Sequence, residues 1–439
     1  MVDILILGAT GITGRQTTRY LATHPQRSQF TFAIAGRSQK KLDDLVSDLS
    51  LSKSIPVHVV DVTRFEQVEA IVKQHRIVLN TVGPYVKWGE NVVRACARNG
   101  VHYTDLTGEQ IFVKEMIEKY AYVASKTGSI IVPACGMDSL PSDMAVFVAN
   151  KALKDYSQNT EPLQIDTSTT VYDIEGVLSN GTVSTIVAAV GSTPSHKMAA
   201  SLRDHFLSPV SGKPSPSPRL VYKTTLPSTL EAVVGGYFLM SSANRAIVQR
   251  SQGLLEYEML TRKTNKANRE RYGSQMVYEE FMRQKSALMG AILTLTLLVG
   301  LGLLAIPPVR WLFGRYGMNE TSAALDKQLA ETGKLTVINV TTSEPSPAFP
   351  KGPVKVETTI SAKGDPGYYL SPAMMAESGL ALLLNRDELP ALAKQGGVLT
   401  PAVALGDVII GRLREFSGFE VVYEVVEGSN GTRESRKSV

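Results

Sequence analysis

A glycine-rich turn directly after a short apolar run constrains this chain more than any other feature. The run ILIL leads straight into GATGITG, after which a helical pattern begins. A GxxGxxG spacing between a strand and a helix permits a tight turn, close approach of a ligand to the backbone, and close packing of the helix on the strand. The free N–H groups at the helix start then favour a phosphate. The motif therefore predicts a site for the pyrophosphate of a dinucleotide, formed by Gly8, Thr10, Gly11, Ile12, Thr13 and Gly14.

The segment after this turn alternates short apolar runs with stretches of helical spacing. The runs are FAIAG, VHVVD, IVLNTVG, HYTDL and IIVPA. Such alternation predicts parallel strands joined by crossover helices. We therefore expect an α/β fold whose first domain, residues 1–140, is a Rossmann-type parallel sheet that binds NAD(P).

The end of the second predicted strand bears on the choice of dinucleotide. NAD-selective domains carry an acidic residue there for the ribose 2′-hydroxyl, whereas an arginine accommodates a 2′-phosphate. Here the strand ends in Arg37 and Ser38. The sequence thus favours NADP over NAD, although Arg37 as a plain solvated charge is the alternative.

The third and fourth predicted strands end in further candidate cofactor contacts. Asp61 is placed to approach the adenine, but it can equally serve as a helix N-cap that needs no ligand. Asn80, Val82 and Gly83 follow the fourth strand, at the sheet edge where open α/β sheets bind ligands. We expect these three residues to contact the nicotinamide half, with a purely structural Gly-Pro turn as the alternative.

Composition and charge exclude several classes of function. The net charge is +5, and the 46 basic residues are dispersed among 41 acidic ones, which argues against nucleic-acid binding. The two cysteines, Cys96 and Cys135, and the six histidines show neither metal-ligand nor disulfide spacing, so we expect no metal. The N-terminus lacks the pattern of a signal peptide, which predicts the cytosolic side of the cell.

The middle of the chain predicts a second domain followed by an apolar segment. Residues 164–190 and 219–240 favour strands and short helices, with a Pro/Ser-rich loop between them. Residues 287–306 are 20 consecutive uncharged residues with basic residues on both flanks. That length is enough to cross a hydrocarbon core of about 30 Å. Strand-like runs and a helical run, PAMMAESGLALLL, come after it.

Several motifs together resemble the saccharopine dehydrogenase-like oxidoreductases. The motifs are GATGITGR, AGRSQKKL, LNTVGPYVKWGENVVRAC, GVHYTDLTGE, PACGMDSLPSD, NGTVSTI, GDPGYYLSPAMMAESGLALLL and GGVLTPAVALGD. The resemblance covers nearly the whole chain. It implies a second α/β domain over 141–365 and a C-terminal segment, 366–439, that returns to the first domain.

The resemblance also implies a cellular setting. This branch is similar to proteins of lipid droplets and membranes, and a bacterial branch consists of trans-acting enoyl reductases of complex-lipid synthesis. If both flanks of 287–306 belong to one soluble body, they lie on the same side of a membrane, which disfavours a single pass. Glycines within the segment and Pro307-Pro308 after it suit a re-entrant or shallowly inserted helix. The alternative is a completely buried core helix.

No residue is marked decisively as the proton donor that hydride transfer requires. Tyr85, Asp105 and Asp138 follow predicted strands on the cofactor side and are the candidate catalytic residues. Each also has a structural interpretation as a cap or turn residue. Tyr122 and Lys126 match a YxxxK pattern, but they lie within a predicted helix without the expected upstream serine.

Three hypotheses of function follow. The first is an NADP(H)-dependent oxidoreductase that acts on a lipid-like substrate at the cytosolic face of a membrane or lipid droplet, with oligomerisation left open. The second is a non-catalytic nucleotide-binding protein of lipid surfaces. The third is an amino-acid dehydrogenase of the saccharopine type, which requires cationic residues for the substrate carboxylates.

Overall fold

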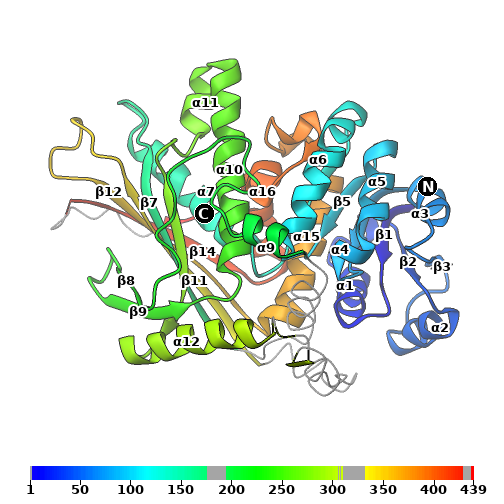
Figure 1. The fold of residues 1–439 in the computed structure, drawn as a ribbon. Coiled ribbons are helices and arrows are strands. Elements are labelled where there is room, and N and C mark those ends of the chain that lie inside the picture. The colour runs from blue at the N-terminus through cyan, green and yellow to red at the C-terminus, as the bar shows by residue number, and fades with distance from the viewer. Residues whose placement is uncertain (1, 176–193, 305, 307, 310–331, 429–436) are drawn as a thin grey trace.

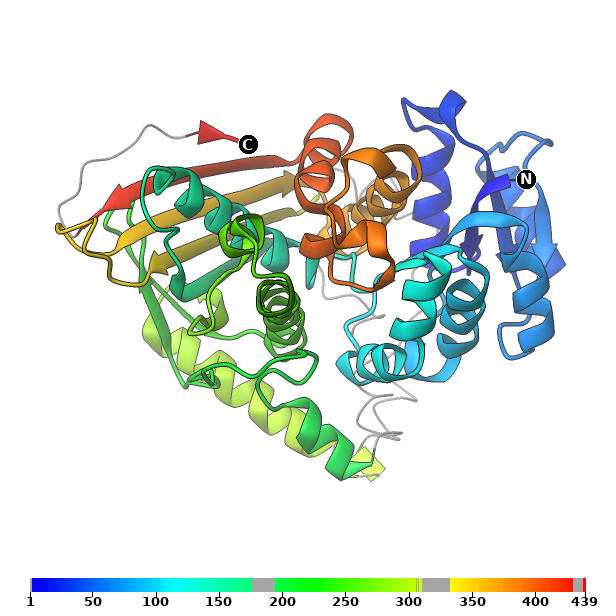
Figure 2. The same cartoon turned by 90° about the horizontal axis from the view of Figure 1, so that it is seen from above.

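The computed structural model describes residues 2–175, 194–304, 306, 308–309, 332–428 and 437–439. The chain forms two sheets with helices between and around them (Figure 1). The N-terminal sheet, blue and cyan, lies on one side, and the second sheet lies on the other. Helices α15 and α16, drawn in orange and red, lie between the two parts in both views (Figure 2).

Seven described strands form the first sheet, all parallel, in the order β13-β6-β5-β4-β1-β2-β3. The predicted Rossmann-type arrangement is confirmed, with one additional strand from the C-terminal part. The six N-terminal strands are β1 (Val2–Leu7), β2 (Phe32–Gly36), β3 (Val57–Val59), β4 (His75–Asn80), β5 (His102–Asp105) and β6 (Ile130–Val132). The connecting helices are α1 (Ile12–Ala22), α2 (Gln39–Asp48), α3 (Phe65–Val72), α4 (Tyr85–Trp88), α5 (Glu90–Asn99) and α6 (Gln110–Thr127).

Sheet burial follows the apolar pattern of the sequence. All five residues of β2 are buried, because helices cover both faces of a parallel sheet. In the second sheet, β12 alternates buried and partly exposed residues along its length. A strand with one packed face and one wetter face shows this period of two.

Eight described strands form the second sheet, in the order β15-β14-β12-β11-β7-β10-β9-β8. It is mostly antiparallel, with β7 and β10 as a parallel pair. The strands are β7 (Ile165–Glu175), β8 (Tyr222–Thr225), β9 (Ala232–Tyr237), β10 (Val277–Gln284), β11 (Lys334–Ser343), β12 (Val354–Lys363), β14 (Glu420–Glu427) and β15 (Lys437–Ser438). Its helices are α7 (Leu140–Tyr156), α9 (Ser195–Ser201), α10 (Ser241–Arg262), α11 (Asn265–Glu270) and α12 (Ala287–Leu304). Residues 176–190 of the predicted stretch 164–190 lie outside the described residues.

The C-terminal segment, residues 366–439, is shared between the two sheets. Helix α15 (Ser371–Leu384) packs against β4, β5 and α1, and β13 (Gly397–Val398) extends the first sheet beside β6. Helix α16 (Pro401–Phe416) packs on α15 and α7. The chain then leaves for the second sheet, because β14 pairs along β12.

A buried carboxylate joins the C-terminal helices to α1. Glu377 on α15 is fully buried and accepts hydrogen bonds from Tyr20 at 2.5 Å and from Arg412 Nε at 2.7 Å. The imidazole of His24 lies 2.7 Å from the same carboxylate. These contacts connect α1, α15 and α16 through one charged group that is out of water.

Another buried polar cluster lies on the face of the second sheet that packs on α7. Asn339 on β11 has no exposed surface, and its amide donates to Ser168 and Thr170 on β7, both at 2.9 Å. Its side-chain oxygen accepts from Thr341 at 2.7 Å. Every polar atom of the Asn339 side chain is therefore engaged between two strands.

Helix α12 is the apolar segment seen in the sequence, and it is not a core helix. Only Gly290 and Thr294 are buried among its residues. Leu288, Ile292, Leu295 and Val299 are 71%, 54%, 51% and 60% exposed. The alternative of a completely buried helix is therefore wrong. Among the described helices, α12 is long and apolar enough to cross a membrane by length and composition.

Helix α12 lies flat along one side of the second sheet rather than projecting from the molecule (Figure 1). It is fixed there by close backbone contact, since a Cβ atom at Gly290 would lie 2.4 Å from the carbonyl oxygen of Gly235. The Thr294 hydroxyl accepts a hydrogen bond from the Tyr237 amide at 2.9 Å. These glycines and this hydrogen bond attach α12 to β9.

Replacing Glu377 with glutamine tests whether this carboxylate holds the C-terminal helices α15 and α16 to α1. The Glu377→Gln variant leaves the Arg412 guanidinium buried without its charge partner, so we expect the free energy of unfolding to fall by about 3–5 kcal/mol. Urea unfolding followed by tryptophan fluorescence measures the change. The control is Asp407→Asn, which breaks an exposed pair with Lys151 at 2.8 Å and should cost less than about 1 kcal/mol. Equal losses in both variants would contradict this role.

Candidate functional site

The glycine loop, residues 8–14, forms a tight turn between β1 and α1. Gly8 has φ = +83°, and a Cβ atom there would lie 2.8 Å from Thr81 Oγ1. A Cβ atom at Gly14 would lie 2.2 Å from the carbonyl oxygen of Gly8, so only glycine lets α1 approach β1 this closely. The Gly11 amide donates to Gly8 O at 3.0 Å and closes the turn.

The start of α1 is open to a ligand. Gly11 is its N-cap, no side chain caps the helix among the described residues, and the first turn carries no acidic residue. Gly11 and Ile12 are exposed. Uncapped amide groups at a helix N-terminus attract a phosphate. The remaining loop residues, Thr10 and Thr13, are partly exposed beside it.

The other predicted cofactor residues lie after the neighbouring strands, at the same sheet edge. Arg37 is exposed after β2, and Ser38 caps α2 by accepting a hydrogen bond from the Lys41 amide at 3.4 Å. Asp61 follows β3, and its carboxylate accepts from the hydroxyl and amide of Thr63 at 2.7 and 2.9 Å. These hydrogen bonds, aided by the charges of Arg64 and Arg37, lower the pKa of Asp61. Among the described residues, no hydrogen bond or ion pair engages the Arg37 side chain. An arginine in this state is suited to accommodate a 2′-phosphate.

Residues after β4 are partly engaged within the protein. Asn80 is buried, donates to the Tyr103 hydroxyl at 3.1 Å and accepts from the Val82 amide at 3.1 Å. Val82 lies against the glycine loop, because its Cγ2 atom would be 2.9 Å from a Cβ atom at Gly8. Gly83 is exposed. The turn after β4 therefore borders the glycine loop. Its conformation is stabilised by the buried Asn80 side chain, which accepts from the Val82 amide.

Two of the three predicted catalytic residues are engaged in the fold. The Tyr85 hydroxyl donates to the Asn80 carbonyl oxygen at 3.0 Å, and burial raises the pKa of Tyr85 well above its usual range. Asp105 has no exposed surface and accepts from Tyr103 at 2.7 Å and from the Ala134 amide at 2.9 Å. Burial raises the pKa of Asp105 to about 6. Both side chains connect neighbouring strand ends.

Asp138, the third predicted catalytic residue, is differently placed. It lies on the Asp138 loop, residues 133–139, which joins β6 to α7 and so passes from one sheet to the other. Within the described part of the chain, no hydrogen bond or ion pair engages its carboxylate, and burial raises the pKa of Asp138 to about 6. Its Oδ2 atom would lie 3.8 Å from a Cβ atom at Gly108, and Met240 lies against that same position. Asp138 thus presents a free carboxyl group between the loops of the two domains.

A buried polar network behind Asp138 was not predicted from the sequence. Glu280 on β10 lies within hydrogen-bond distance of the Tyr278 and Ser142 hydroxyls, and Tyr172 on β7 donates to the Asp138 carbonyl oxygen. Both strands belong to the second sheet, so the network reaches the Asp138 loop from the opposite domain. The available signal is the alternation in VYEEF, which puts Glu280 on the same strand face as Tyr278.

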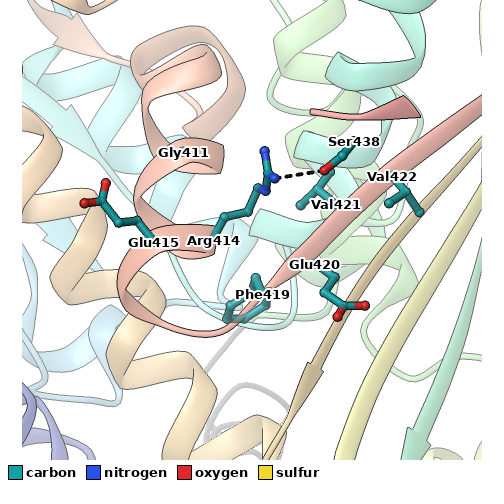
Figure 3. Close-up of a pocket in the computed structure, with 8 residues that line it drawn as sticks. All are labelled: Gly411, Arg414, Glu415, Phe419, Glu420, Val421, Val422 and Ser438. Atoms are coloured by element: carbon teal, nitrogen blue, oxygen red, sulfur yellow. Dashed lines mark hydrogen bonds between the residues drawn. The ribbon is translucent and has the colours of Figure 1, made fainter. Parts of the chain in front are cut away.

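A surface hollow of about 590 Å³ lies elsewhere, between the end of α16 and the strands β14 and β15 (Figure 3). The Arg414 guanidinium crosses it and donates to the Ser438 hydroxyl at 2.8 Å. Its lining contains none of the predicted site residues. The residues that line it are Gly411, Arg414, Glu415, Phe419, Glu420, Val421, Val422 and Ser438.

Comparison with known proteins gives the family. Residues 4–132 match the sequence profile described as the saccharopine dehydrogenase NADP binding domain. A Mycobacterium tuberculosis protein, provisionally named a trans-acting enoyl reductase, is 30% identical over 433 residues, which cover 94% of this chain and 95% of that protein. The chain belongs to the saccharopine dehydrogenase-like oxidoreductases.

One further relative has a name that refers to lipid droplets, and one solved structure has a similar fold. A Caenorhabditis elegans relative named lipid droplet localized protein is 26% identical over 422 residues, covering 92% of this chain and 94% of the relative. The apo saccharopine dehydrogenase (L-Glu forming) of Saccharomyces cerevisiae is 12% identical with a TM-score of 0.52, covering 100% of both chains. It shares the fold of this saccharopine dehydrogenase-like oxidoreductase.

The cofactor predicted from the sequence, NADP, is that of the family's N-terminal domain. The observed loop fits this group, since glycine is required at positions 8 and 14 and the first turn of α1 lacks a side-chain cap in the described structure. The glycine loop is therefore the part of the domain suited to hold the pyrophosphate.

A Gly11→Asp substitution tests the glycine loop without disturbing the turn. A Cβ atom at Gly11 meets the protein only at 3.4 Å, and aspartate is a favoured N-cap, so the variant should fold. Its carboxylate would occupy the helix amides and repel a pyrophosphate, lowering NADPH affinity by at least about tenfold. Fluorescence titration with NADPH measures this. The matched control is Gly411→Asp, at an exposed glycine of α16 with no neighbour within 4 Å. Unchanged NADPH affinity in folded Gly11→Asp protein would refute the assignment.

Proposed function

We propose that this chain is an NADP(H)-dependent reductase that works at a lipid surface and reduces a conjugated carbon–carbon double bond in an apolar, lipid-like substrate. The observation that supports work at a lipid surface is α12, an apolar helix whose outer face is exposed on the surface of the molecule. The relatives named for enoyl reduction and for lipid droplets point to the same chemistry and setting.

The exposed side of α12 supports docking on a lipid surface rather than crossing it. Leu288, Ile292, Leu295 and Val299 follow one another at spacings of four, three and four residues, so they lie on one helix face. Gly290 and Thr294 lie on the opposite face and attach the helix to β9. A helix fixed flat against a folded body, with one apolar face outward, suits shallow insertion among headgroups.

The site and α12 are connected by one short stretch of chain. Tyr237 donates its amide to Thr294 on α12, and the next residue, Phe238, stacks on Tyr172 with ring centroids 4.5 Å apart. Met240 then lies against Gly108, next to Asp138. A substrate with its apolar part in a lipid layer under α12 would thus have its polar end near the Asp138 loop.

Asp138 is the residue we propose as the proton donor. When bound, NADPH supplies a hydride, and reduction of the conjugated double bond then needs one proton at the neighbouring carbon. A carboxylic acid with a raised pKa keeps a usable proton near neutral pH. Burial raises the pKa of Asp138 to about 6, and its carboxylate is free of partners among the described residues. Tyr85 and Asp105 then serve to shape the strand ends beside it.

Substitution of Asp138 tests the proton donor. We expect Asp138→Asn to lower kcat by roughly 10²–10⁴-fold, because an amide cannot supply the proton, while NADPH affinity stays unchanged. The assay follows NADPH oxidation with acyl thioesters that carry a conjugated double bond. Asp105→Asn is the comparison, since loss of its strand-end contacts should lower stability as well as rate. Tight NADPH binding by wild-type protein without turnover of any such substrate would instead favour a non-catalytic protein of lipid surfaces.

Charged substitutions on α12 test lipid docking. We expect the double variant Ile292→Glu, Val299→Glu to abolish flotation with phosphatidylcholine vesicles. A charge on the helix face that enters the lipid layer opposes insertion. Both residues are exposed, so stability should be unchanged. The control is Leu260→Glu, a 62% exposed leucine near the end of α10. Helix α11 follows that end, on the opposite side of the molecule from α12 (Figure 1). Flotation retained by the double variant would exclude α12 as the docking element.

A further inference from the structure

Glu280 is a buried acid without a charge partner in the described structure. It is 1% exposed, and no ion pair to it is found among the residues that the structure describes. A buried, unpaired carboxylate is costly, and such a group tends to take up a proton instead. Its hydrogen bonds reveal which form the fold accommodates.

A hydrogen-bonded chain runs from Tyr278 through the Glu280 carboxyl group to the Asp138 loop. Its Oε2 atom lies 2.7 Å from the Tyr278 hydroxyl and 2.9 Å from the Ser142 hydroxyl. Ser142 Oγ lies 2.6 Å from the Tyr172 hydroxyl. The Tyr172 hydroxyl lies 2.7 Å from the carbonyl oxygen of Asp138. The chain therefore has four contacts in series.

A count of hydrogens decides the protonation state of this chain. Each of the four contacts needs one hydrogen between its two oxygen atoms, and the carbonyl oxygen of Asp138 supplies none. The three hydroxyl groups, Tyr278, Ser142 and Tyr172, supply three. With Glu280 ionised, one contact of 2.6–2.9 Å is left without a hydrogen. With Glu280 protonated, Glu280 donates to Ser142, Ser142 to Tyr172 and Tyr172 to Asp138, and every contact is satisfied.

We infer that Glu280 is a protonated carboxylic acid in the folded protein, and that its proton completes the chain through Ser142 and Tyr172 that positions the Asp138 loop. Glu280 is thus a positioning residue that acts through Tyr172. Its importance for reduction rests on the proposed function, whereas its protonation does not.

A second link from Glu280 to the same loop does not depend on the proton. Asn244 on α10 donates to Glu280 Oε1 at 2.8 Å and accepts from Ser139 at 3.0 Å. This link persists when Glu280 ionises, because a carboxylate accepts from an amide equally well. Ionisation therefore breaks one of two attachments and loosens the Asp138 loop without releasing it.

The groups around Glu280 agree with this assignment. Burial raises the pKa of Glu280 to about 7, although its hydrogen-bonding contacts with Tyr278, Ser142 and Asn244 offset part of the effect, and the nearby Asp138 adds to it. Burial also raises the pKa values of Tyr172 and Tyr278 well above their usual range, so both remain donors at neutral pH.

The elements packed on Glu280 bring few other titratable groups. From α7 the neighbouring acid is Asp143, which is directed away to Ser251 at 2.5 Å and to the Ala402 amide at 2.8 Å. From α10 the facing group is Asn244, which does not titrate. Burial raises the pKa of Asp143 to about 7 as well, so it needs its own control.

Infrared spectroscopy of the full-length protein tests the proton directly. The wild-type protein at pH 6 should show the carbonyl stretch of a protonated carboxylic acid that disappears in Glu280→Gln. Asp105→Asn, Asp138→Asn and Asp143→Asn assign the bands of the other buried aspartates whose pKa values are raised to about 6 or 7. An unchanged set of protonated-acid bands in Glu280→Gln would show that Glu280 is ionised and would overturn the inference.

The pH dependence of stability provides a second measurement. The pKa of Glu280 is raised above its unfolded value of about 4.3, so the folded state binds the proton more tightly. Stability due to this proton is present below pH 4.3 and is lost as pH rises through about 7. Wild-type protein should lose stability relative to Glu280→Gln between pH 5 and pH 8. Parallel curves over that range would count against a protonated Glu280.

A matched pair of tyrosine variants tests the positioning role. Tyr172→Phe cuts the chain before Asp138, whereas Tyr278→Phe removes a donor on the other side of Glu280. Hydrogen exchange of the backbone amides in residues 134–139 should accelerate at least about fivefold in Tyr172→Phe and stay within twofold of wild type in Tyr278→Phe. Where the protein turns over an enoyl substrate, kcat should fall about tenfold in Tyr172→Phe alone. Equal exchange in the two variants would overturn the positioning role, even if no substrate is found.

Discussion

The contact of Glu377 with α1 and α16 is the interaction on which the rest of the molecule depends. The glycine loop needs α1 to lie against β1, and α1 is held from behind by a carboxylate that also binds Arg412, more than 390 residues from the turn it supports. Because α16 continues into β14, the same contact fixes the second sheet relative to the first. Because the buried Glu377 carboxylate must stay paired with Arg412, it favours the one arrangement of α1, α15 and α16 that keeps this pair together.

Two functional surfaces meet within this frame. The parallel sheet presents its loops to a dinucleotide, and the second sheet carries an apolar helix on its outside and an acidic, hydrogen-bonded network on its inside. The Asp138 loop belongs to both sheets by connectivity, since it ends the first and begins the helix that packs on the second. Its position is therefore sensitive to elements of both sheets, as the proposed reduction of a surface-bound substrate would require.

Much of the fold and part of the candidate site could be predicted from local sequence patterns. The rest could not, because it depends on contacts between segments that are far apart in the sequence. The apolar runs and the glycine spacing specify β1 to β6 and the phosphate loop, because these features depend on neighbours a few residues apart. The division of 366–439 between two sheets depends on strand pairing between β12 and β14, which no local pattern reports. The burial of Tyr85 and Asp105 in strand-end contacts, and the convergence of Tyr172, Ser142 and Glu280, likewise arise only when segments about 30 and 140 residues apart meet. Among the predicted catalytic residues, sequence reasoning gave no basis for preferring Asp138.

The position of Asn339 has a consequence for biosynthesis. The sequence Asn339-Val340-Thr341 satisfies the N-glycosylation pattern, yet the asparagine amide lies without solvent exposure between β11 and β7 and donates to two hydroxyl groups there. A sugar attached to that nitrogen would remove one of its hydrogens and force a bulky polar group between α7 and the sheet. Glycan attachment at this position and formation of the second sheet therefore exclude each other. A ribosome that released this chain into a compartment with oligosaccharyltransferase would set modification in competition with folding, whereas release on the opposite side of that membrane leaves the strand free to pair.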